Sequence, residues 1–345
     1  MATTGSTARS SRLGWVPVTL GAVALLAAAI LGLTLGPAGI RASGVLGALV
    51  DALPIADVDH GLNDVELTIL FQIRFPRVVL GALVGAVLAM AGASYQGVFR
   101  NPLADPYLLG VAAGAGLGAT AAFALGLERW LVAPLAFVGG LVAVAVTYLL
   151  GRSVGGRTTT SLILAGVAVG AFATAVQTYL LQRNVEVLRE VYSWILGRLT
   201  TVGWGEVWVM LPYALVAGAI LLGSRRLLDV LSVGDDEARS LGIRVESVRA
   251  VVVVLATLAT AAAVSVSGLI GFVGIIVPHG IRILFGWSYR VILPLSVLFG
   301  AAFLIGADVA ARTLVAPAEL PIGVLTAFFG APFFILVLRS SRRLR

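Results

Sequence analysis

Residues 74–118 read RFPRVVLGALVGAVLAMAGASYQGVFRNPLADPYLLGVAAGAGLG, and this stretch decides the fold class. About 22 uncharged residues follow Arg77, which is enough to cross the hydrocarbon core of a bilayer as a helix. Pro102 and Pro106 then interrupt the helix, because each lacks an amide proton and disfavours helical geometry at the preceding residue. A second apolar run, rich in Gly and Ala, follows at once. The stretch predicts two membrane spans that are joined by a tight turn and lined by small residues.

The composition is that of an integral membrane protein. Of the 345 residues, 59% are hydrophobic and 12% charged, whereas a soluble domain carries about 25% charged residues. There is no cysteine, which excludes disulfides, thiolate metal sites and a cysteine nucleophile. All 24 basic residues are arginine, so the chain lacks the lysine that a P-loop ATPase needs. We attribute the net charge of +7 to the arginine bias of cytoplasmic loops rather than to nucleic-acid binding.

Charge-free runs long enough to span a membrane recur along the chain. Nine are visible, at residues 16–37, 78–99, 106–127, 130–151, 158–182, 207–224, 250–278, 291–307 and 320–338. Both chain ends carry arginine and are predicted to be cytoplasmic, which requires an even number of spans. A glycine-rich sequence at 267–274 would divide the run 250–278. The sequence therefore predicts an all-α protein with about ten spans in one transmembrane domain, residues 13–345, after a cytoplasmic tail, residues 1–12.

The arginines support this layout. Sixteen fall on the predicted cytoplasmic side and eight on the outer side, as the positive-inside rule requires. The main cytoplasmic segment is 225–249, in which an acidic triplet precedes a short helical pattern that Gly242 would end. Gly234, Ala238 and Gly242 stand four residues apart and would share one face. That face either docks into a partner's groove or belongs to a solvated loop.

Ionisable residues within or beside the spans are the other candidates. Asp308 and Arg312 are four residues apart on one predicted helix, where they can pair; the pair is either a functional intramembrane site or a structural one. Arg74, Arg77 and Arg312 would form a basic patch at the outer surface, against the usual bias, so we expect an acidic partner there. His279 is interpreted as a hydrogen-bonded packing residue. The sequence shows no metal-ligand spacing and no catalytic motif, and this predicts that the chain is not an enzyme.

Ordered motifs cover nearly the whole chain and resemble the permease subunits of type II ABC importers, the FecCD-type family that carries iron–siderophores, haem and cobalamin. The matching motifs are RFPR at 74–77, ALVGA at 82–86, NPLADP at 101–106 with LG at 109–110, LAG at 164–166, WILG at 194–197, the small residues of 234–242, GFVG at 271–274, VPH at 277–279, the AD and AR pairs of 307–312, ELPIG at 319–323 and GAP at 330–332. One departure is Arg198, where a small residue is usual.

The resemblance implies a ten-helix permease that works as a homodimer or heterodimer with two cytoplasmic ATPase subunits and an extracytoplasmic substrate-binding protein. The arginines 74, 77 and 312 would meet acidic residues of the binding protein. An ATPase-coupling helix would comprise Gly234, Asp235, Asp236, Glu237, Ala238, Leu241 and Gly242. The inner gate would comprise Asn101, Leu103, Thr159 and Thr160. No cofactor is expected in this chain, because ATP and Mg would be bound by the ATPase.

The expected function is import of a metal chelate across the plasma or inner membrane, with both termini cytoplasmic. An iron–siderophore is the first expectation, and haem or cobalamin the alternative. We expect a largely apolar lining with small residues, which would bind cargo weakly. Two rival classes remain open. A membrane-embedded enzyme would need a convergent polar site, which only Asp308 and Arg312 approach, and an ion-coupled secondary transporter would need buried carboxylates that face a cavity.

Overall fold

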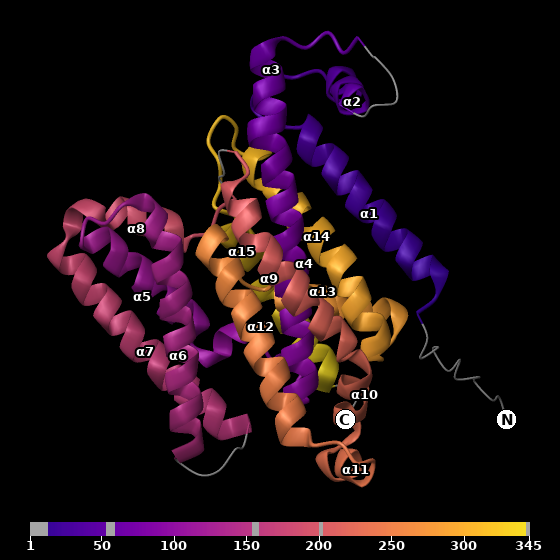
Figure 1. Ribbon diagram of the computed structural model, residues 1–345, viewed down its shortest axis with the longest axis vertical. Helices are drawn as coiled ribbons and strands as arrows, with labels where there is room; N and C mark the ends of the chain where they lie inside the picture. Colours follow the sequence, from indigo (N-terminus) through magenta and orange to yellow (C-terminus); the bar gives the residue numbers. More distant parts are fainter. Residues whose placement is uncertain (1–12, 53–58, 154–158, 200–202, 343–345) are drawn as a thin grey trace.

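The computed structural model describes residues 13–52, 59–153, 159–199 and 203–342, and every regular element in them is a helix (Figure 1). The α-helices are α1 (Trp15–Thr34), α2 (Ala42–Asp51), α3 (Asp64–Ile69), α4 (Phe75–Phe99), α5 (Val111–Ala124), α6 (Val132–Ser153), α7 (Thr159–Arg183), α8 (Leu188–Ile195), α9 (Gly205–Gly223), α10 (Arg225–Val233), α11 (Asp235–Ser240), α12 (Val245–Ser267), α13 (Val273–Phe285), α14 (Tyr289–Thr313) and α15 (Ile322–Arg342). A π-helical turn, η1 (Leu70–Arg74), joins α3 to α4, and 3₁₀ turns lie at Pro106–Leu109 (η2), Arg129–Leu131 (η3) and Val185–Val187 (η4).

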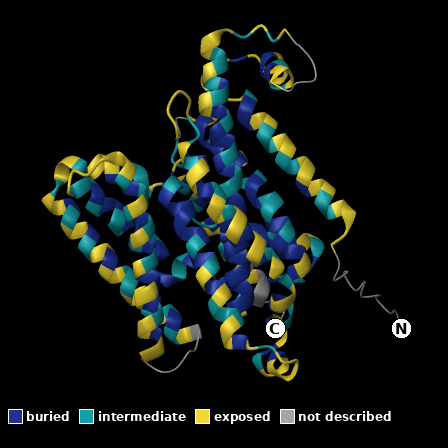
Figure 2. Ribbon diagram, viewed as in Figure 1, coloured by how far each residue is buried: buried dark blue, intermediate teal, exposed yellow. Residues whose placement is uncertain are grey.

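The centre of the molecule is α4, which is buried along almost its whole length (Figure 2). It packs against α9, α12, α13 and α14. Two glycines let neighbouring backbones touch it. A Cβ on Gly85 would lie 2.3 Å from the carbonyl oxygen of Gly300 in α14, and a Cβ on Gly92 would lie 2.2 Å from that of Gly274 in α13. The prediction that small residues permit close helix packing is confirmed.

Helices α5 to α8 form a second group beside this centre (Figure 1). Close backbone contacts at glycine also hold this group together. A Cβ on Gly114 would lie 2.3 Å from the carbonyl oxygen of Gly139 in α6, and one on Gly166 in α7 would lie 2.1 Å from that of Leu108. The group therefore packs backbone to backbone through glycines, as α4 does with its own neighbours.

The turn between α4 and α5 has the sharp geometry that its two prolines predict. Arg100 ends α4 in the left-handed region with φ +50°. Asn101 Oδ1 then accepts a hydrogen bond from the Leu103 N–H at 3.0 Å, and Asp105 Oδ1 accepts one from the Tyr107 N–H at 2.8 Å. Each side-chain oxygen thereby satisfies a backbone N–H that has no helical carbonyl to donate to after α4 has ended. The predicted break between two apolar helices is confirmed.

The predicted division of the run 250–278 is also confirmed. Helix α12 ends at Ser267 and α13 begins at Val273. Between them Gly268 has φ +68° and Phe272 has φ +67°, a conformation that few side chains adopt. The Phe272 ring lies on Gly330 of α15, where a Cβ would approach the ring's Cγ to 2.3 Å. The break therefore brings a bulky ring against a glycine on the last helix.

Seven segments of the described chain are long and apolar enough to cross a membrane: α1, the continuous run α3–η1–α4, the run η3–α6, α7, α9, α12 and α14. The apolar helices Val111–Ala124, Val273–Phe285 and Ile322–Leu336 are shorter than that criterion. The all-helical transmembrane fold is confirmed, and the count of ten spans stays a prediction. The tail, residues 1–12, lies outside the described residues.

Candidate functional site

A π-helical turn opens α4 at one end of the molecule. Pro76 has no N–H to donate to the carbonyl of Gln72, four residues earlier. That carbonyl accepts a hydrogen bond from the Gly203 N–H at 2.7 Å instead. The bond that proline removes is thereby replaced by one that ties this end of α4 to the chain preceding α9, next to Arg74 and Arg77.

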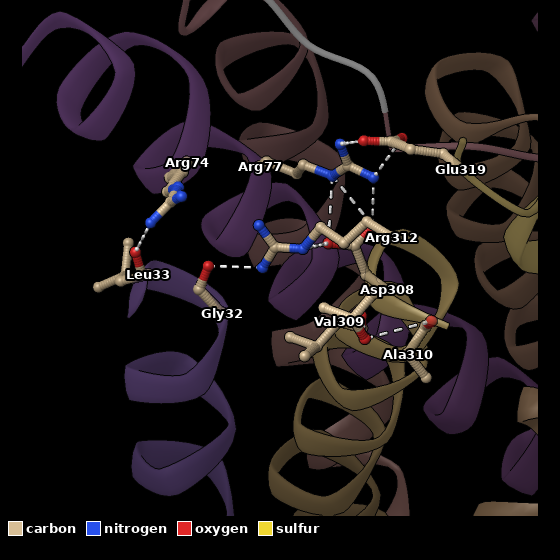
Figure 3. Close-up of polar contacts among 10 residues, drawn as sticks. Gly32, Leu33, Arg74, Arg77, Asp308, Val309, Ala310, Arg312 and Glu319 are labelled. Atoms are coloured by element: carbon tan, nitrogen blue, oxygen red, sulfur yellow. Dashed lines mark hydrogen bonds and ion pairs between the residues drawn. The ribbon is translucent and has the colours of Figure 1, made fainter. Parts of the chain in front are cut away.

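Arg77 is the centre of a buried ion cluster (Figure 3). Its Nη2 lies 2.8 Å from Asp308 Oδ1, and its Nε donates to both oxygens of that carboxylate at 3.0 and 3.1 Å. The same guanidinium also binds the Glu319 carboxylate in a bidentate manner: Nη1 donates to Oε1 at 3.1 Å and Nη2 donates to Oε2 at 3.0 Å. Arg312 Nε stands 3.4 Å from Asp308 Oδ2, so the predicted pair Asp308–Arg312 is confirmed. A bidentate fork is the strongest form of such a contact.

Arg312 of this cluster and the neighbouring Arg74 also hold the C-terminal end of α1. Arg74 Nη1 donates to the carbonyls of Leu33 at 2.8 Å and Thr34 at 3.0 Å, and its Nη2 donates to Ala38. Arg312 Nη2 donates to the carbonyl of Gly32. The last carbonyls of a helix lack partners within the helix and carry partial negative charge, so a guanidinium satisfies both needs. We call Arg74, Arg77, Asp308, Arg312 and Glu319 the outer network.

The prediction that Arg74, Arg77 and Arg312 lie at the same end of the molecule is confirmed. The prediction that they form an exposed patch is wrong. Their exposed fractions are 4%, 8% and 3%. The positive charge is taken up by Asp308, by Glu319 and by the carbonyls of α1, all within the chain. Docking to a binding protein therefore stays a prediction that the geometry of the single chain does not support. Of the network, only the Glu319 side chain is substantially exposed, at 38%.

Segment 225–249 lies at the opposite end of the molecule and folds into α10, α11 and the start of α12 (Figure 1). The short helix was predicted, and Gly242 follows its end with φ +79°. The acidic residues Asp235, Asp236 and Glu237 form its first turn rather than preceding it, where they complement the helix dipole.

The small-residue face of α11 is turned inward, contrary to the docking interpretation. Ala238 is fully buried and Gly234 is also buried, while Gly242 is exposed. Small residues were expected to admit a partner, but here they let α11 pack closely on its own chain. The two most exposed large apolar residues of segment 225–249 flank α11: Val233 is 71% exposed and Leu241 is 69% exposed.

Asp235 links α11 to two other helices. It lies 3.1 Å from Arg249 Nη2 in α12 and 3.4 Å from Arg100 Nη2 at the end of α4. Arg100 is followed by two of the predicted gate residues, Asn101 and Leu103. Both gate residues are partly buried. Thr160 is exposed at the start of α7, and the side chain of Thr159 lies outside the described residues. The gate assignment stays a prediction.

The structure shows the surroundings of His279 and Arg198, whose roles the sequence did not establish. The His279 ring packs edge-on against Phe333 at 5.7 Å between centroids, which confirms the packing interpretation. Its Nδ1 has no hydrogen-bond partner among the described residues, so the expected hydrogen bond is not seen at that atom. Arg198 is exposed, and its N–H donates to the carbonyl of Ser267 at 2.8 Å.

Sequence reasoning missed a polar cluster at the C-terminal end of α4. Pro278 leaves the carbonyl of Gly274 without its helical donor, and Gln96 Nε2 donates to it at 2.8 Å. Gln96 Oε1 accepts from Arg282, which also donates to the Tyr289 hydroxyl at 3.3 Å. The available signal was an uncharged polar residue, Gln96, inside an apolar span. A search restricted to charged residues passes over it.

Comparison with known proteins identifies the family. The model of the FecCD transport family matches residues 24–340. The cobalamin import system permease protein BtuC of Halobacterium salinarum is 39% identical over 96% of this chain and 92% of its own length. The iron(3+)-hydroxamate import system permease protein FhuB of Bacillus subtilis is 37% identical over 97% and 88%.

A Bacillus subtilis permease of an Fe(3+)-citrate import system, YfmD, is 36% identical over 86% of this chain and 89% of its own length. Among solved structures, a protein described as a metal-chelate type ABC transporter, in an inward-facing conformation, superposes with a TM-score of 0.81 at 30% identity, over 94% of this chain and 99% of that one. Together with the family match, these relatives show that the chain belongs to the FecCD transport family and is a permease subunit of a type II ABC importer.

Proposed function

We propose that this permease passes a bulky metal chelate into the cytoplasm and that the chelate is an iron–siderophore. Two relatives with iron-chelate names, the iron(3+)-hydroxamate and Fe(3+)-citrate permeases, support the class of cargo. Membership of the family implies a separate ATPase, a substrate-binding protein and a second permease chain. The energy for transport therefore comes from ATP hydrolysed outside this chain.

The observation that carries the proposal is the apolar surface that helices of the single chain expose, and we assign the charge-free faces of α7 and α15 to the walls of the cargo path. Helix α7 has no charged residue between Thr159 and Gln182, and it exposes Phe172 at 71% and Leu164 at 65%. Helix α15 exposes Phe328 at 72% and Phe329 at 60%. A path with such walls offers few polar groups to a chelate, so the cargo is not held tightly and can leave once the gates open.

Cobalamin is the second candidate, because the Halobacterium salinarum relative with that name matches almost the whole length of both chains. Both cargoes are large metal chelates, and both suit walls without charge. Haem stays a prediction from the resemblance alone. We expect the binding protein to select the cargo, since α7 has no charged residue between Thr159 and Gln182 and α15 has none between Ile322 and Leu338.

The proposed assembly assigns each end of the molecule a partner. The ATPase meets segment 225–249, with Val233 and Leu241 as the exposed apolar contacts. The binding protein meets the end that carries the outer network, where Glu319 is the most exposed member. The gate is formed by Asn101, Leu103, Thr159 and Thr160. Both termini are cytoplasmic, as the arginine distribution favours.

The test is transport into liposomes by the permease assembled with its ATPase and its binding protein. Uptake of a ⁵⁵Fe-labelled siderophore is compared with uptake of labelled cobalamin at equal concentrations, with ATP on the ATPase side. The matched control contains an ATPase that binds but does not hydrolyse ATP. We expect ATP-dependent uptake of the iron chelate. Uptake of cobalamin alone would replace the first candidate by the second, and ATP-independent uptake of either would contradict the importer function.

A further inference from the structure

Asp229 of α10 reaches across to the first turn of α14. Its Oδ1 accepts a hydrogen bond from the Tyr289 N–H, and its Oδ2 accepts one from the Ser288 hydroxyl at 2.9 Å. The same carboxylate pairs with Arg290 Nε at 3.2 Å. Three consecutive residues of one helix start are therefore held by one side chain of segment 225–249.

This contact is more than a helix cap. Ser288 already occupies the N-cap position of α14, and its Oγ accepts from the Arg290 N–H at 3.3 Å. Asp229 adds contacts from a different helix, 59 to 60 residues earlier in the chain. An acidic group at a helix N-terminus is favourable by itself, but a group that belongs to another element also fixes the position of the two elements relative to each other.

Helix α14 connects this contact to the outer network. It is one helix from Tyr289 to Thr313, with Pro294 in its second turn, and Asp308 and Arg312 in its last turns hold Arg77 of α4 and Gly32 of α1. At about 1.5 Å per residue, the 19 residues from Tyr289 to Asp308 span about 29 Å. One continuous helix thus has polar contacts to other helices at both of its ends.

Helix α4 is bound to α14 along the same length. The backbones touch at Gly85 and Gly300, where an added Cβ would lie 2.3 Å from the opposing carbonyl oxygen. At the inner end, Arg282 connects Gln96 of α4 to the Tyr289 hydroxyl of α14. At the outer end, Arg77 of α4 pairs with Asp308 of α14. The two helices are therefore expected to move together.

We propose that Asp229 is the positioning residue that transmits movement of the ATPase-facing segment 225–249 to the α4–α14 pair, and through that pair to the outer network. The inference rests on the proposed docking of the ATPase at this segment. A displacement of α10 pulls on Tyr289 and Ser288 through the carboxylate, and the rigid pair carries it to Arg77, Asp308 and Glu319. ATP binding to the ATPase thereby displaces the residues of the outer network, at the end of the molecule where cargo arrives.

The decisive measurement combines transport with a distance. The complex of permease, ATPase and binding protein is reconstituted with wild-type chain, with Asp229→Ala, or with the matched control Asp64→Ala, which removes an exposed carboxylate from the first turn of α3. Cargo transported per ATP hydrolysed is determined for each. Because the chain has no cysteine, spin labels at Val185→Cys in η4 and Val315→Cys after α14 report on the outer end without background.

Complexes are assembled with excess unlabelled permease, so that one chain carries the labels, and the label distance is compared with and without ATP. We expect Asp229→Ala to keep ATP hydrolysis, to lower cargo transported per ATP by about 5-fold or more, and to lose the ATP-dependent change in distance. Asp64→Ala should match wild type in both readouts. An Asp229→Ala complex with wild-type transport per ATP and the wild-type distance change would overturn the proposal.

Two further arms keep the test decisive. If Asp229→Ala does not assemble, Ser288→Ala/Arg290→Ala removes two of the three contacts from the α14 side and leaves α10 intact; unchanged coupling in that variant overturns the proposal. The distance readout needs no cargo. A wrong cargo assignment therefore abolishes transport but leaves the difference between wild type and Asp229→Ala, whereas a wrong role for Asp229 removes that difference.

Discussion

Arg77 forms ion pairs of two kinds, and their different burial predicts different energies. The Asp308 side chain is 3% exposed and that of Glu319 is 38% exposed. Removing one partner of a buried pair typically costs about 3–5 kcal/mol, and an exposed pair contributes about 1 kcal/mol or less. We therefore expect Asp308→Ala to destabilise the protein several times more than Glu319→Ala, as measured by thermal or denaturant unfolding in detergent. Equal losses for the two variants would contradict the burial that the structure assigns.

Asp105 gives the turn between α4 and α5 a pH dependence. Burial raises the pKa of this carboxyl from 3.8 to about 6, against the opposing effect of the hydrogen bond from the Tyr107 N–H. Between about pH 4 and pH 6 the folded protein keeps a proton that the unfolded chain has lost, so stability falls as pH rises through this window. Above it, the ionised group costs about 3 kcal/mol.

We therefore expect Asp105→Asn, which keeps an acceptor for the Tyr107 N–H, to be more stable than wild type at pH 7.5. At pH 4 the two proteins should unfold at nearly the same temperature. The measurement is the difference between the two unfolding curves at each pH, in which the titration of the other carboxylates cancels. A difference that does not change with pH would show that Asp105 is not the titrating group.

Ion pairs could be predicted from the sequence only where the two partners are close in sequence. The spacing of Asp308 and Arg312 indicated their pair because i and i+4 share a helix face. Arg77 meets the same carboxylate across 231 residues, and no local pattern encodes that distance. Positive charge at the outer end was therefore interpreted as an exposed patch, although carbonyls of α1 and two carboxylates of the chain neutralise it. Asp229 was missed for the same reason.

The contact between α4 and α14 depends on glycine at one crossing point. A Cβ on Gly85 would lie 2.3 Å from the Gly300 carbonyl oxygen, and backbone cannot move aside as a flexible side chain can. We expect Gly85→Ala to cost about 1–3 kcal/mol of unfolding free energy. The matched control is Gly306→Ala in α14, where nothing lies within 4 Å of the added methyl. That variant should be neutral or slightly stabilising, because alanine favours helix over glycine, and a loss like that of Gly85→Ala would contradict the proposed contact.

Ala238 in α11 and Leu241 directly after it differ in burial, which predicts opposite results for two substitutions. Leu241 is 69% exposed, so Leu241→Ser should weaken co-purification with the ATPase while leaving the unfolding temperature of the permease unchanged. Ala238 is fully buried, so Ala238→Leu should lower that temperature through overpacking, typically by about 1–3 kcal/mol of stability. If Leu241→Ser binds the ATPase like wild type, the exposed apolar face is not the docking surface.

Elements were predicted well where local chemistry decides them. The breaks at Arg100–Asp105 and at Gly268–Phe272 follow from proline and glycine, whose backbone limits act within a few residues. The direction in which α11 turns its small residues is not a local property. Glycine and alanine suit a partner's groove and the chain's own interior equally well, and only the packing of α10 and α12 against α11 selects the inward face.

At the level of the whole chain, the arginine distribution indicated which segments lie at the same end. The structure places α3 and the outer network at one end and α10 and α11 at the other (Figure 1). Arg74 and Arg312 reach the C-terminal end of α1, so α1 begins at the end that carries segment 225–249. Charge bias could predict this grouping because insertion is governed by charge, but it could not show how far each short helix crosses the bilayer.

This arrangement predicts the accessibility of single cysteines introduced into a chain that has none. Val65 in α3 and Val315 after α14 are 67% and 50% exposed, and Val233 and Leu241 are exposed at the other end. In intact cells, a membrane-impermeant maleimide should label Val65→Cys and Val315→Cys. Val233→Cys and Leu241→Cys should react only after permeabilisation, because the positive-inside rule predicts that the end with sixteen of the 24 arginines is cytoplasmic. Labelling of Val233→Cys from outside would invert the topology and with it the assignment of the ATPase to segment 225–249.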